Sequence, residues 1–170
     1  MAAPATLWAV RTRLYEIFRD AIAASDARGR RARVFEGTRT TGGAPDLFLL
    51  VGAPSALDDD LTVDVPPWGR LTSAPDPMGP GTWRLEEGEI DCAAVAWTGS
   101  ADGRPELRLD VADVVATCEA ALVADPKLGG LLEGEHRAQL AGQEFRDPLT
   151  ADGPFAEVVF TVVYTQRAVI

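Results

Sequence analysis

The chain has 170 residues, of which 46% are hydrophobic and 25% are charged, and its formal net charge at pH 7 is −10. These values are typical of one globular domain with a real core, and they argue against non-specific binding to nucleic-acid phosphates. No apolar run reaches the roughly 20 residues that a membrane-spanning helix needs. The N-terminus lacks a basic start followed by an apolar stretch, so we expect no signal peptide.

The charge is distributed unevenly along the chain. Residues 11–39 carry eight arginines against four acidic residues, whereas residues 40–170 carry eight basic and 22 acidic residues. Oppositely charged regions allow attraction to a second copy or to a polar partner. A solvated helix face followed by an arginine-rich loop would explain the same pattern equally well.

The N-terminal third predicts one helix and two strands. Apolar residues recur every three or four positions from Thr6 to Ala24, which indicates an amphipathic helix with Thr6 as its N-cap. Residues 33–36 form a short apolar strand that ends at Gly37. Residues 46–52 are almost continuously apolar, which predicts a strand covered on both faces.

Residues 53–82 are the least regular segment of the chain. Proline and glycine are frequent there, and apart from a possible short strand at 61–65 we expect an irregular loop. Unstructured connections longer than about 12 to 15 residues are uncommon in compact domains and are usually functional or disordered. Trp68 and Met78 suggest that this loop packs on its own domain or on a neighbour.

The second half alternates strands with one helix. Residues 83–97 predict a long strand, residues 104–124 a helix that stops at Asp125-Pro126, and residues 139–145 a modest strand. The final strand, residues 154–170, has its apolar side chains at period two. On this strand Val158, Phe160, Val162, Tyr164, Ala168 and Ile170 are expected to share one face.

These elements predict an α+β fold, residues 1–170 forming a single domain. Short turns between strands indicate a mostly antiparallel or mixed sheet of about five strands, with two helices packed on one face. The other face or edge of the sheet then needs another cover, and an oligomer would supply one.

We find no catalytic constellation in the sequence. His136 is the single histidine, and Cys92 and Cys118 each lie in an apolar pattern that indicates buried free thiols in a reducing compartment. Asp58-Asp59-Asp60 lacks the rest of a calcium-loop pattern, and neither a phosphate-binding glycine loop nor a nucleophile elbow occurs. The four tryptophans would suit a ligand platform, but core packing and interface anchoring are more common uses. We therefore expect no enzyme, no catalytic or metal-binding residue and no cofactor.

The order of the motifs resembles the tail terminator proteins of long-tailed (siphovirus-type) phages of actinobacteria. The resemblance spans essentially the whole chain. It rests on an opening helix LWAVRTRLYEIF, the strands VFEG and LFLLVG, an acidic loop, the strand EEGEIDCAAVAWTG, a helix closing with AALVADPKLGG, the stretch LAGQEF and an alternating terminal strand. Each motif is weak alone, and their order and spacing carry the resemblance.

The resemblance implies a structural virion protein that is assembled in the host cytoplasm. Such subunits form a hexameric ring on the head-proximal end of the tail tube. The ring ends tube polymerisation and meets the head-tail stopper protein, and genomic DNA passes through its channel without specific binding. The expected partners are thus other copies, the tube protein and the stopper. The expected interface residues are Arg28, Arg30, Arg31, Arg33, Asp58, Asp59, Asp60, Trp68 and Met78.

Other functions stay open at this point. Another neck component, either the stopper itself or a head-tail adaptor, is the nearest alternative. A small ligand-binding or regulatory domain would fold the segment from Trp68 to Trp83 over a pocket. A hydrolase would need carboxylate chemistry at Asp58 to Asp60.

Overall fold

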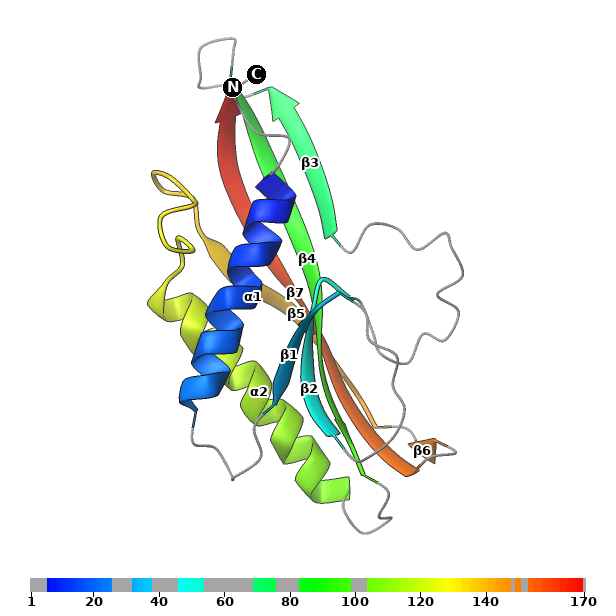
Figure 1. The fold of residues 1–170 in the computed structure, drawn as a ribbon. Helices are drawn as coiled ribbons and strands as arrows, with labels where there is room; N and C mark the ends of the chain where they lie inside the picture. Colours follow the sequence, from blue (N-terminus) through cyan, green and yellow to red (C-terminus); the bar gives the residue numbers. More distant parts are fainter. Residues whose placement is uncertain are drawn as a thin grey trace.

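The computed structural model describes residues 6–25, 32–37, 46–53, 69–75, 83–98, 104–147, 149–150 and 153–169. Two helices and seven strands occur in these ranges (Figure 1). In chain order they are α1 (Thr6–Ala24), β1 (Arg33–Glu36), β2 (Asp46–Val51), β3 (Gly69–Pro75), β4 (Trp83–Trp97), α2 (Arg104–Ala124), β5 (Ala138–Arg146), β6 (Leu149–Thr150) and β7 (Gly153–Val169). Neither helix is long and apolar enough to cross a membrane.

The α+β prediction is confirmed. Five strands follow one another across the sheet in the order β1-β2-β4-β7-β5, while β3 pairs with β4 and the two-residue β6 pairs with β7. Only the β1–β2 pair is parallel among the described strands. Both helices pack on the same face of this sheet (Figure 1). Side chains from both helices belong to one core cluster with side chains from that face of the strands.

The prediction of an irregular loop over residues 53–82 is wrong for part of that range, because Gly69–Pro75 forms β3. β2 pairs only with residues 92–97 of β4. The part of β4 before residue 92 therefore needs another partner on the same edge. β3 pairs with residues 84–90 there and satisfies their backbone groups. Pairing across the sheet thus decides the conformation of a stretch whose composition alone favours a loop. The possible strand at residues 61–65 lies outside the described residues.

β4 and β7 form the central antiparallel pair of the sheet. They stay in register from Trp83 opposite Val169 to Trp97 opposite Phe155, and Figure 1 shows them side by side along the length of the molecule. As predicted for β7, alternate side chains lie on the helix-facing side. This set includes Val158, Phe160, Val162 and Tyr164.

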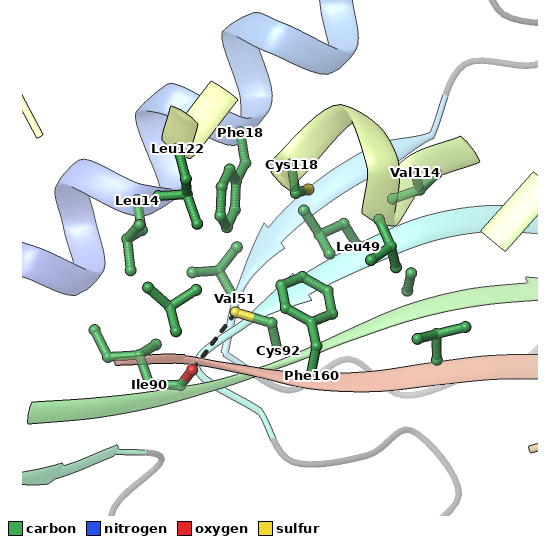
Figure 2. Packing of buried hydrophobic residues seen from close by; sticks show 14 of the residues in the cluster. Leu14, Phe18, Leu49, Val51, Ile90, Cys92, Val114, Cys118, Leu122 and Phe160 are labelled. Atoms are coloured by element: carbon green, nitrogen blue, oxygen red, sulfur yellow. Dashed lines mark hydrogen bonds between the residues drawn. The ribbon is translucent and has the colours of Figure 1, made fainter. Parts of the chain in front are cut away.

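The main core fills the space between the two helices and the sheet. Figure 2 shows Phe18 of α1 and Cys118 of α2 above Phe160 of β7. The rings of Phe18 and Phe160 meet edge-on, with centroids 6.4 Å apart. This geometry is favourable for aromatic pairs.

A second apolar cluster lies on the opposite face of the sheet. Phe48 and Leu50 of β2 belong to it, together with Val95 of β4 and Phe155 of β7. Leu47, Leu49 and Val51 instead belong to the helix-side core. The prediction that β2 is covered on both faces is therefore confirmed.

Arg11 joins α1 to the ends of β1 and β2. Its Nε lies 3.3 Å from a carboxylate oxygen of Glu36, and its guanidinium lies 4.9 Å from the ring centroid of Trp8. The same side chain crosses Gly52, where a Cβ would come within 2.7 Å of Nε. Gly52 has a φ of +81°, so both the conformation and the close approach favour glycine.

A buried polar network lies on the helix side near the start of β4. Glu86 is fully buried, and one of its carboxylate oxygens accepts a hydrogen bond of 2.6 Å from the side-chain amide of Gln166. Arg84 lies 2.7 Å from the other oxygen. Burial, with a smaller contribution from Glu86, raises the pKa of Tyr164. A charge buried in this way is tolerated because it is paired and hydrogen-bonded.

The two cysteines are free and buried, as predicted. Cys92 donates a weak hydrogen bond to the carbonyl oxygen of Ile90, with the two atoms 3.9 Å apart (Figure 2). Burial raises the pKa of the Cys92 thiol to about 12, and burial also raises the pKa of Cys118 well above its usual value. Such thiols are poor nucleophiles at neutral pH.

These pKa shifts predict that the free energy of unfolding falls as the pH rises above about 9. In that range the unfolded chain loses its thiol protons, whereas the folded chain keeps the Cys92 proton up to a pH of about 12. Each such thiol contributes a slope of about 1.4 kcal/mol per pH unit. Urea unfolding at several alkaline pH values measures the slope. The Cys92→Ala variant should show a shallower slope, and an unchanged slope would contradict this account.

Candidate functional site

The structure describes only one of the residues that the sequence suggested as interface contacts. Arg33 is exposed at the start of β1, and its guanidinium lies 5.9 Å from the centroid of the Phe35 ring. The other candidates lie outside the described residues: Arg28, Arg30, Arg31, Asp58, Asp59, Asp60, Trp68 and Met78. The expectation that these residues form contacts therefore stays a prediction.

The residues that could carry chemistry do not converge in the described ranges. Nδ1 of His136 lies 3.0 Å from the hydroxyl oxygen of Thr165, so the ring is tied to the sheet. No group of three or more histidine, cysteine or acidic side chains able to hold a metal ion occurs in the described part of the chain. Trp83 and Trp97 lie at opposite ends of β4, on the order of 45 Å apart, and cannot share a ligand platform.

The outer face of α2 is an apolar surface that is exposed and that no other described element covers. Leu109 is 47% exposed and Val123 is 76% exposed. Ala112, Ala116 and Ala120 lie between them at spacings of three or four residues and are exposed as well. Because the opposite side of α2 packs in the core, the helix is apolar on both sides. An exposed apolar surface of this kind is a candidate contact surface for another chain.

β3 provides an open sheet edge. It pairs with β4 along one side, and its other edge has no partner among the described strands. Residues 70–75 are all exposed, including Leu71 at 40%. An exposed strand edge presents unpaired backbone groups to which another chain can add a strand.

The other long edge strand, β5, is less suited to strand addition. Its pairing with β7 shifts register between Ala141 and Gln143, and Gly142 at this bulge has a φ of +64°. Bulges bend and twist an edge away from regular pairing. The edges that β3 and β5 form are therefore not equivalent.

A polar hollow of about 320 Å³ lies on the sheet face opposite the helices. We call it the β4–β7–β5 hollow, after the three strands that form it. Its lining consists of Glu87, Gly88, Glu89, Arg137, Gln139, Val163, Tyr164 and Thr165. Carboxylates from β4 thus stand on one side of the hollow, and the guanidinium and amide groups of Arg137 and Gln139 stand on the other.

No protein-family model matches this chain. No curated protein matches it significantly either.

The outer face of α2 and the hollow were not predicted from the sequence. The spacing of Leu109, Ala116 and Val123 in the sequence would have indicated an apolar second face on that helix. The hollow has no comparable local signal. Arg137 and Glu87 are 50 positions apart, and only the pairing of β5 and β4 with β7 brings them to one surface.

Proposed function

We propose that the chain is the subunit of a hexameric ring that caps the head-proximal end of a phage tail tube. In this role it ends tube polymerisation and joins the tail to the head-completion protein. The order of helix, strands, helix and two long strands supports the proposal, because it follows the order in which the sequence resembles tail terminator proteins. The ring requires no chemistry, only surfaces that bind other copies and neighbouring proteins.

The observation that carries the proposal is the presence of two unlike open surfaces on one subunit. The outer face of α2 is apolar, and the edge of β3 that has no partner among the described strands offers backbone hydrogen-bonding groups. Figure 1 places α2 and β3 on different sides of the molecule. A ring needs such a pair, because each subunit binds the next through two different patches. An open strand edge without a partner would otherwise favour uncontrolled association.

Charged substitutions on the outer face of α2 should reduce ring formation by at least about tenfold, because each would bury a carboxylate in an apolar contact. Leu109→Asp and Val123→Asp test this, since both side chains are exposed in the subunit and the fold should survive. Light scattering and binding to purified tails measure assembly, and thermal unfolding checks the fold.

Leu131→Asp is the matched control, because Leu131 is 38% exposed but lies beyond the end of α2. This variant should assemble normally. Rings that form equally well with Val123→Asp would remove the α2 face from the proposal. Binding of the protein to purified heads in place of tails would favour the stopper or adaptor function.

A further inference from the structure

The β4–β7–β5 hollow holds opposite charges that do not pair with each other. Glu87 and Arg137 both line it, yet neither makes an ion pair within the described part of the chain. Glu89, next to Glu87 on the same side, lies 3.3 Å from Arg70 of β3. The hollow therefore has a negative side and a positive side.

The sheet register fixes how these groups are arranged. Glu89, Val163 and Gln139 form one row across the three strands, since Val163 pairs with both of the others. In the adjacent row Glu87 pairs with Thr165. Arg137 lies at the other end of this row, because it directly precedes Ala138, which pairs with Tyr164. β4 and β5 lie on either side of β7, and strands in this relation are separated by roughly 10 Å. The charged side chains thus face each other across a strip whose middle consists of Val163 and Thr165.

We propose that the hollow binds a small linear zwitterion, a short aliphatic chain with a cationic group at one end and a carboxylate at the other. The cation lies against Glu87 and Glu89, where two carboxylates outweigh the single charge of Arg70. The carboxylate lies against Arg137 and accepts a hydrogen bond from the side-chain amide of Gln139. The aliphatic chain lies over Val163 and the methyl group of Thr165.

The dimensions of the hollow fit this class of ligand. Its volume of about 320 Å³ is at the lower end of the range for small-molecule sites. A ligand of nine non-hydrogen atoms held mainly at its two ends would bind with a dissociation constant in roughly the millimolar range. This site is independent of the ring proposal, because it lies within one subunit and requires no second copy.

The probe that tests the site is 6-aminohexanoate, compared with hexylamine and hexanoate, each of which lacks one of the two charged ends. Titration followed by amide NMR should shift the resonances of Gln139, Val163 and Thr165 with 6-aminohexanoate. Each single-ended probe should bind at least about fivefold more weakly, because it loses one charge-assisted contact.

Variants of Glu87 and Arg137 provide a second test of the site. Glu87→Gln and Arg137→Gln should each weaken binding of 6-aminohexanoate by at least about fivefold. Glu119→Gln, an exposed change on α2 outside the hollow, should leave binding unchanged. The proposal is overturned if 6-aminohexanoate causes no shifts at tens of millimolar. Equal binding of hexylamine, or equal affinity in the Glu87→Gln and Arg137→Gln variants, would also overturn it.

Discussion

Replacing Gly88 with alanine should lower the free energy of unfolding by about 3 kcal/mol, the upper part of the usual range for overpacked cores. Gly88 pairs directly with Tyr164 across β4 and β7, and the tyrosine ring lies over it. A Cβ at position 88 would come within 2.1 Å of two ring carbons and 2.4 Å of the hydroxyl oxygen. Tyr164 is only 2% exposed, so moving its ring aside would disturb the packed side chains around it.

Urea unfolding of Gly88→Ala measures this cost, and a double-mutant cycle with Tyr164→Ala isolates its cause. With the ring removed, the added methyl group has room, and Gly88→Ala should cost much less than in the wild-type background. The coupling between the two substitutions should exceed about 1 kcal/mol. An equal cost in both backgrounds would show that the strand backbone, and not the ring, requires glycine.

Replacing Phe160 with alanine should lower the free energy of unfolding by about 3 to 5 kcal/mol, the range for large cavities in packed cores. Phe160 is 1% exposed and meets Phe18 of α1 edge-on, so it connects the central strand pair to the helix layer. Because the core around it contains residues from both helices, the cavity would border several elements that cannot all collapse together.

Phe145→Ala is the matched control, since it removes the same side chain from the neighbouring strand β5. Phe145 is 48% exposed, and we expect its replacement to cost less than about 1 kcal/mol. Chemical unfolding of both variants compares the two positions. Similar costs at both would contradict the assignment of Phe160 to the core.

The elements that contain a long stretch of periodic apolar residues were predicted well from the sequence. α1 and α2 have the predicted bounds, and β4 and β7 agree with their predictions to within a residue or so. The two faces of β4 follow from strict alternation along the strand, which leaves one choice once the core side is known. Cys92 lies on the helix side and Val95 on the opposite side, as their positions in the alternation require.

Features that depend on distant parts of the chain were not predictable in this way. β3 is a strand because part of the β4 edge needs a partner, and nothing within Gly69–Pro75 indicates that. The requirement for glycine at position 88 depends on a tyrosine 76 positions later in the chain. The hollow likewise depends on register across three strands. Local patterns specify elements, whereas sites formed between strands require the pairing to be known.

The measurement that tests the ring proposal most directly is electron microscopy of purified tails incubated with the purified protein. We expect a six-fold ring at the head-proximal end of each tail tube, with subunits related by rotation about the tube axis. The Val123→Asp variant should leave the tail ends bare, and Leu131→Asp should decorate them as the wild type does. Tail ends that stay bare with folded wild-type protein would contradict the proposed function.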